Sequence, residues 1–140
     1  MDNNRVVISA LFLGAKMQIQ KISKTVTSAL AYIEDAIDPQ AKGNIEKVMQ
    51  LTWRAASDLE YGLFLFSLRY PEETRSSSCK LPPIKHPKIE SLLASTQELL
   101  KEAAKSLEAS DQKEAHKKMW MARGQLLRIH DLFEKKQRKT

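Results

Sequence analysis

Cysteine, glycine and proline are scarce in this chain, and each scarcity argues against a class of structure. The 140 residues include a single cysteine, Cys79, so no disulfide can form within the chain and a secreted disulfide scaffold is not expected. Only 4 Gly and 5 Pro are present, and most of the prolines fall in one short stretch. So few helix breakers favour long, uninterrupted helices over a sheet with many turns.

Long apolar runs are also missing. No stretch of about 18 apolar residues exists, so the sequence predicts no transmembrane helix. An apolar run from Val6 to Ala15 begins near the N-terminus, but Lys16, Gln18 and Lys21 follow it without a small-residue cleavage site. We therefore interpret this run as part of a helix rather than a signal peptide, and we predict a cytoplasmic protein that binds no membrane.

The patterns that hold metals and nucleotides are absent as well. Di-iron bundles need Glu-x-x-His pairs, which place two ligands one helical turn apart, and no His of this chain has a Glu three residues before it. One Cys and three scattered His do not form a zinc site, and there is no Gly-rich phosphate loop or Gly-x-Ser-x-Gly turn. We predict no catalytic residues, no metal, no cofactor and no small-molecule substrate.

Helical periodicity is the strongest signal that is present. In the first forty positions, apolar residues recur at heptad spacing in two interleaved rows, as in a helix that packs along one seam: Ile8, Ala15, Ile22, Ala29 and Ala36 in one row, Phe12, Ile19, Val26 and Ile33 in the other. Similar rows predict four helices in all, at about 5–37, 44–70, 87–108 and 111–136.

The residues between these segments predict where each helix ends and the next begins. Asp38-Pro39 is expected to end the first helix, and Tyr70-Pro71 the second. Asn44 and Asp111 are suitable N-caps, and Pro87 suits the first turn of the third helix. Residues 71–86 lack periodicity and predict an exposed loop. The sequence thus predicts one all-α domain over 1–140, an up-down four-helix bundle of two antiparallel helical hairpins joined by that long loop.

Positive charge gathers at the end of the chain. The net charge is +6, and residues 111–140, with nine basic and four acidic residues, carry a net charge of +5. On the last helix a second stripe, besides the core face, lies within an arc of about 80° and includes Trp120, Arg123 and His130. Trp and Arg stack on bases and anchor interfaces. This pattern predicts that the last helix and the basic tail at 135–140 bind RNA, single-stranded DNA or an acidic protein through Lys113, Lys117, Lys118, Trp120, Arg123, His130, Lys135, Lys136, Arg138 and Lys139.

The second half of the second helix is apolar almost all round. Its residues beyond the core rows are Tyr61, Phe64, Leu65 and Leu68. A soluble monomer rarely exposes so much contiguous apolar surface, so either the first helix covers them or they pack against another protein. The alternative function is therefore a structural or adaptor protein that forms a homodimer or a larger complex through this face.

One family resemblance arises on the last helix. Arg123-Gly-Gln-Leu-Leu-Arg-Ile-His130 is similar to the Arg-x4-6-His motif of the helical HEPN ribonucleases, over eight residues of 140 and with Gly124 where that family has a polar residue. The resemblance implies that Arg123 and His130 face an RNA phosphate and that His130 is a general acid or base.

The sequence thus leaves three functional hypotheses. The first, which the charge distribution favours, is a non-catalytic module that binds nucleic acid. The second is an adaptor protein, and the third is a metal-independent ribonuclease. In a fourth interpretation, Trp120 only widens the core and the lysines are solvated.

Overall fold

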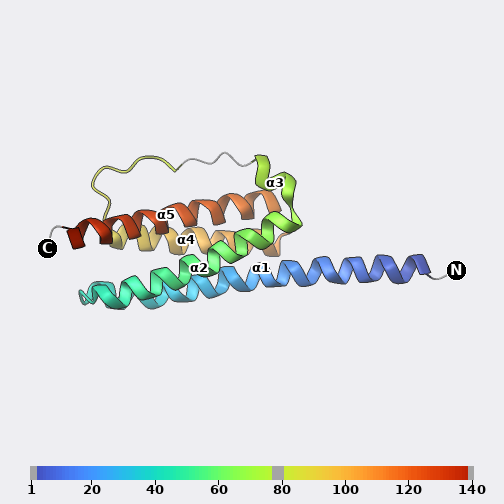
Figure 1. Cartoon of the computed structure of the whole chain (residues 1–140), viewed down its shortest axis with the longest axis horizontal. Helices are drawn as coiled ribbons and strands as arrows, with labels where there is room; N and C mark the ends of the chain where they lie inside the picture. Colours follow the sequence, from blue (N-terminus) through green and yellow to red (C-terminus); the bar gives the residue numbers. More distant parts are fainter. Residues whose placement is uncertain (1–2, 77–80, 139–140) are drawn as a thin grey trace.

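Five helices make up the part of the chain that the computed structural model describes, residues 3–76 and 81–138. They are α1 (Asn3–Ala41), α2 (Ile45–Arg69), α3 (Pro71–Ser76), α4 (Ile89–Glu108) and α5 (Gln112–Arg138), and no strand occurs in these residues. The predicted all-α fold of two helical hairpins is confirmed, because α1 packs closely on α2 and α4 on α5 (Figure 1). Within the described residues, no helix is long and apolar enough to cross a membrane.

The two hairpins pack side by side into a four-helix bundle. α1 also packs on α4, and α2 on α5, so each long helix has two neighbours. Figure 1 shows that α2 ends at one end of the bundle and that α4 begins at the opposite end. All neighbouring helices are therefore antiparallel, and in chain order the four long helices run up, down, down and up.

The predicted apolar rows form the core of this bundle. In α1, Ile22, Val26 and Ile33 have no exposed surface. In α5, the apolar residues at helical spacing are all at most 2% exposed: Ala115, Met119, Ala122, Leu126, Ile129 and Phe133. Ile45, which heptad spacing from Thr52 and Leu59 places in the core, is instead 48% exposed, because it is the first residue of α2 and lies at the end of the bundle. Heptad spacing thus identified nearly all of the core.

The predicted end of α1 at Asp38-Pro39 is wrong, because the helix includes Pro39 and continues to Ala41. Gly43, with φ +74°, lies in the left-handed region, and its N–H donates to the carbonyl of Gln40 at 3.1 Å. The N–H of Asn44 donates to the carbonyl of Pro39 at 2.9 Å. This pair of bonds is a Schellman motif, which satisfies the carbonyls of Pro39 and Gln40 at the end of the helix.

Helix starts agree with the sequence at two of three positions. Asn44 accepts a hydrogen bond from the N–H of Lys47 at 3.3 Å, and Asp111 accepts one from the N–H of Glu114 at 3.2 Å, so both predicted N-caps are confirmed. The prediction that the third helix starts at Pro87 is wrong, because α4 begins at Ile89 after an extended Lys88. His86, with φ 55°, turns the chain just before it.

The predicted exposed loop at 71–86 is partly helical. Pro71 begins the short helix α3, whose first turn carries Glu72 and Glu73, a composition that suits a helix N-terminus. Residues 77–80, Cys79 among them, lie outside the described residues. Further along, Leu81 is half-buried, and the carbonyl of Pro82 accepts a hydrogen bond from Arg128 of α5 at 2.6 Å. Residues 82–86 are exposed, as predicted.

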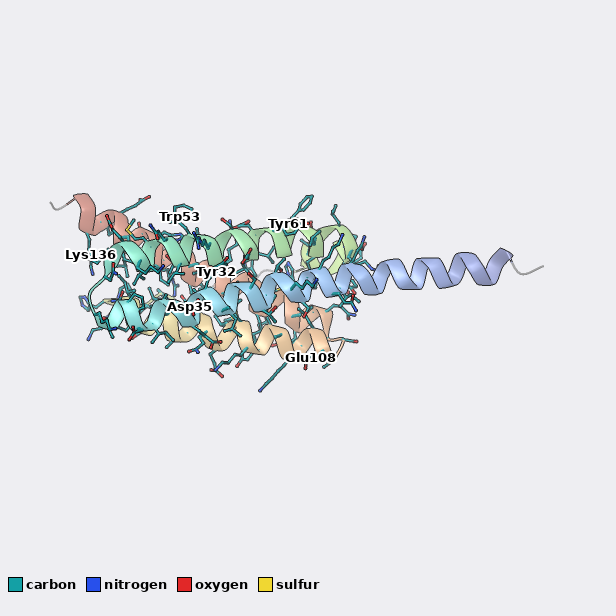
Figure 2. All side chains as sticks on the ribbon, turned by 90° about the horizontal axis from the view of Figure 1, so that it is seen from below. Tyr32, Asp35, Trp53, Tyr61, Glu108 and Lys136 are labelled. Atoms are coloured by element: carbon teal, nitrogen blue, oxygen red, sulfur yellow. The ribbon has the colours of Figure 1, made fainter. Side chains whose placement is uncertain are left out.

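The N-terminal part of α1 continues beyond the bundle. Ser28 of α1 donates a hydrogen bond to Asp58 of α2 at 2.6 Å, so Arg69, the last residue of α2, is level with about residue 17 of α1. Residues 3–17, which we call the N-terminal arm, therefore extend past the end of α2 by roughly 22 Å of helix. Both views show the arm without another helix beside it (Figures 1 and 2).

Candidate functional site

Six large apolar side chains are exposed along the outer face of the α2–α5 pair. Four belong to α2 and two to α5, and we call them the apolar band: Trp53 (58% exposed), Tyr61 (53%), Phe64 (57%), Leu68 (64%), Trp120 (40%) and Leu127 (50%). The band includes both tryptophans of the chain. Figure 2 shows Trp53 and Tyr61 on the same outer side of α2.

Three contacts between α2 and α5 fix the register of the band. The rings of Trp53 and His130 stack with their centroids 4.3 Å apart, and those of Phe66 and His116 lie 5.0 Å apart. Between these ring pairs, Arg123 forms an ion pair with Glu60. Residue numbers rise along α2 as they fall along α5, and this register brings the exposed rings of α2 and α5 onto one continuous surface.

A shallow groove of about 640 Å³ lies between the two helices at one end of the band. Trp53 and Leu127 supply its apolar surface. The polar groups that line it are acidic or neutral: three carboxylates, of Glu60, Asp131 and Glu134, together with Ser57 and His130. No Lys or Arg lines this groove. An extended apolar side chain, or a helix that carries positive charge, matches such a surface.

Trp120 is held in a fixed orientation on the outside of α5. The guanidinium carbon of Arg123 lies 5.0 Å from the centre of the Trp120 ring, and the His116 ring stacks on Trp120 with the centroids 6.3 Å apart. Arg123 is itself positioned by its ion pair with Glu60. The predicted stripe on the last helix therefore exists at the flank of the bundle, next to the buried ring of His116.

Of the basic residues predicted on the last helix, Lys113 and Lys117 are seven and three residues before Trp120 and share its side of α5, whereas others have acidic partners. Lys118 bonds to Glu102 of α4 at 2.9 Å, which chiefly raises its pKa, and thus lies on the side of α5 away from α2. Lys135 pairs with Asp131 at 3.1 Å. Lys113, Lys117 and Lys136 are exposed. Arg138 ends α5, its side chain is not described, and Lys139 lies outside the described residues.

The predicted interface on α2 matches the band more closely. Tyr61, Phe64 and Leu68 are exposed and α1 does not cover them, whereas Leu65 is half-buried against the core. Sequence reasoning missed Trp53 as a member of this face. The sequence could have placed Trp53 on this face, because Trp53 and Phe64 are eleven residues apart, about three helical turns, and therefore share one side of α2.

Burial lowers the pKa of two histidines at the contact between α2 and α5. It lowers the pKa of His116 and of His130, because removal from water disfavours the charged imidazolium; Glu73 and Glu134, respectively, act weakly in the opposite direction. Nδ1 of His116 and Nε2 of His130 are buried without a hydrogen-bond partner. Both rings are thus held as neutral, largely apolar packing groups near neutral pH.

These lowered pKa values predict acid sensitivity. Between the folded-state pKa of each ring and about 6.5, the unfolded chain binds more protons than the folded chain, so stability falls as the pH drops through this range, by at most about 1.4 kcal/mol per pH unit for each ring. We expect the urea midpoint to be lower at pH 5 than at pH 7.5, and His116→Met to lose roughly half of that difference. An equal pH effect in the variant would contradict the assignment.

The two residues of the HEPN-like motif are engaged in other contacts. Arg123 pairs with Glu60 and lies over Trp120, and His130 stacks on Trp53.

Among the described residues, no three His, Cys, Asp or Glu side chains are grouped so that they could hold a metal ion. Scans against protein-family models, curated proteins and solved structures find no match to this chain.

Proposed function

We propose that this chain is a non-catalytic helical adaptor that binds another protein through the apolar band. The observation that carries the proposal is the exposure of six large apolar side chains, both tryptophans included, on one face. Scattered apolar residues on a surface need no explanation, but a contiguous aromatic patch is typical of a protein-binding site. In the fold of a single copy, these side chains contribute little to the core.

The chemistry of the band suits a strong interface anchor. Trp, Tyr and Arg are the residues that most often dominate binding energy, and Trp120 and Arg123 lie in contact at the middle of the α2–α5 face. Because Glu60 and His116 hold this pair in place before binding, little side-chain freedom remains to be lost. Fixed anchors of this kind favour a protein partner with a complementary apolar surface.

Charge supports a protein partner over a nucleic acid at this face. The groove beside Trp53 is lined by three carboxylates, two of them paired with Arg123 and Lys135, and no Lys or Arg lines it to bind a phosphate. Three of the basic residues expected to grip a nucleic acid, Lys118, Arg123 and Lys135, already have acidic partners in the fold. The nucleic-acid function stays a prediction that rests on Lys113, Lys117, Lys136 and the tail.

A photo-cross-linking amino acid at position 61 tests the proposal. Tyr61 is 53% exposed in the band, so an aromatic cross-linker fits there without disturbing the core. We expect discrete protein adducts after irradiation in the host cell of this chain. The matched control places the same group at Lys105, an exposed residue of α4, the helix diagonally opposite α2. Equal labelling from both positions, or none from position 61, would contradict a docking role for the band.

A parallel titration separates this function from the nucleic-acid alternative. Labelled single-stranded RNA is titrated with the chain at 50 and 200 mM salt and followed by fluorescence anisotropy. Phosphate contacts would make any affinity fall steeply with salt. The adaptor proposal predicts that Trp120→Ala removes the position-61 adduct and leaves whatever RNA affinity exists unchanged. RNA binding that depends on Trp120 would instead assign this face to nucleic acid.

A further inference from the structure

The N-terminal arm continues α1 past the point where any other described helix lies beside it (Figure 1). The heptad rows of α1 run without a break from Ile8 to Ile33 in the sequence. From Ile22 onward these rows are buried by α2 and α4. The arm continues the same helix beyond the end of α2, where no other helix lies beside it (Figure 1).

The composition of the arm makes a partner necessary. Nine of the fifteen residues from 3 to 17 are hydrophobic, and positions 8, 12 and 15 continue the face that is buried further along α1. A single helix in water gains little from its own backbone bonds, since most helical stability in proteins comes from packing an apolar face. A helix of this kind is stable when another surface covers its seam.

Length and position match the arm to the band. The arm is about 22 Å long, and the band extends over sixteen residues of α2, from Trp53 to Leu68, whose ends are also about 22 Å apart. Leu68 lies one residue before the end of α2, at the end of the bundle from which the arm emerges. Two copies placed end to end with their arms antiparallel would therefore bring each arm alongside the α2–α5 face of the other copy.

Charge is complementary across this contact. The arm carries Arg5 and Lys16, and no Asp or Glu occurs between residues 3 and 33. The groove at the Trp53 end of the band is lined by Glu60, Asp131 and Glu134 and by no Lys or Arg. Two of these carboxylates already have basic partners within the chain, Arg123 for Glu60 and Lys135 for Asp131. Charge therefore adds only a modest preference for a positively charged arm over a second band, and the apolar surface carries most of the pairing.

We propose that a second copy of this chain occupies the apolar band, and that the two copies exchange N-terminal arms in a twofold-symmetric dimer. The inference rests on the proposed function, because it names the protein that the band binds. In such an exchange, each arm–band contact occurs twice, as a closed symmetry requires.

Sedimentation velocity of the full chain at about 200 µM tests this pairing. The wild type should sediment as a dimer of twice 16.0 kDa. Phe12→Glu in the arm and Phe64→Glu in the band should each weaken the association at least 100-fold and give monomers. Phe64 is 57% exposed, and circular dichroism is used to verify that both variants retain their helicity. An equimolar mixture of the two variants should form dimers again, because the mixed pair keeps one intact arm–band contact.

The other outcomes each overturn the pairing. If Phe12→Glu remains dimeric, two bands face each other; if Phe64→Glu remains dimeric, two arms do. A mixture that stays monomeric excludes arm exchange. A monomeric wild type excludes the second copy, and arm-dependent binding to anionic lipid vesicles would then assign the arm to a lipid surface. A monomer that still gives a position-61 adduct with another protein would retain the adaptor function and refute only this inference.

Discussion

Phe66→Ala is expected to lower the free energy of unfolding by about 3–5 kcal/mol, while Phe64→Ala should change it by less than about 0.5 kcal/mol. The two residues are two positions apart on α2. Phe66 has no exposed surface and contacts the rings of Tyr70 and His116, so its removal leaves a cavity in the core. Phe64 is 57% exposed and fills no cavity in a single copy.

Urea denaturation followed by circular dichroism measures both effects. The titration is run at the lowest practical protein concentration, because association stabilises the folded state by mass action and would give Phe64→Ala an apparent cost. The difference between the two variants is then a property of the single chain. A loss of several kcal/mol for Phe64→Ala in the dilute chain would mean that the band belongs to the core, and the docking proposal would lose its basis.

Trp120→Ala should weaken binding of the protein that covers the band by about 2–4 kcal/mol, a factor of roughly 30 to 1000 in the dissociation constant. The change removes the largest apolar anchor on α5 and also the ring over which Arg123 lies. Ile84→Ala is a matched control, because Ile84 is 44% exposed but lies on the connecting segment, outside the band.

The dissociation constants of both variants come from dilution series of the complex, followed by sedimentation or anisotropy. The control should bind as the wild type does. Equal affinities for Trp120→Ala and the wild type would show that Trp120 packs only against its own chain and does not anchor the partner. A comparable loss in both variants would indicate a general response to surface change rather than an anchor.

The sequence was most informative about the core. Ile22, Val26 and Ile33 were predictable because burial of one seam imposes a heptad pattern that composition alone would not produce. Helix ends were less predictable. Proline predicts a break, yet Gly43 closes α1 with a Schellman motif four residues beyond Pro39, and the backbone geometry of that closure is not visible in residue types.

The electrostatics of the last helix could not be read from its own residues. Its lysines and arginines suggested a basic surface, but Glu60, the partner of Arg123, lies 63 positions away in the sequence. Lys118 likewise pairs with Glu102 on a different helix. Such pairs depend on which helices are neighbours, and that order follows from the crossing between α2 and α4. The same ordering leaves Phe64 57% exposed.

Quenching of tryptophan fluorescence by acrylamide tests the central claim most directly, because the only two tryptophans, Trp53 and Trp120, both belong to the band. The free, dilute chain is compared with the chain bound to whichever protein the position-61 cross-link identifies, a second copy included. Coverage of the band predicts that the quenching constant falls severalfold and that the emission shifts to shorter wavelength on binding. Tryptophans that remain as accessible in the complex as in the free chain would contradict the assignment of this face as the docking surface.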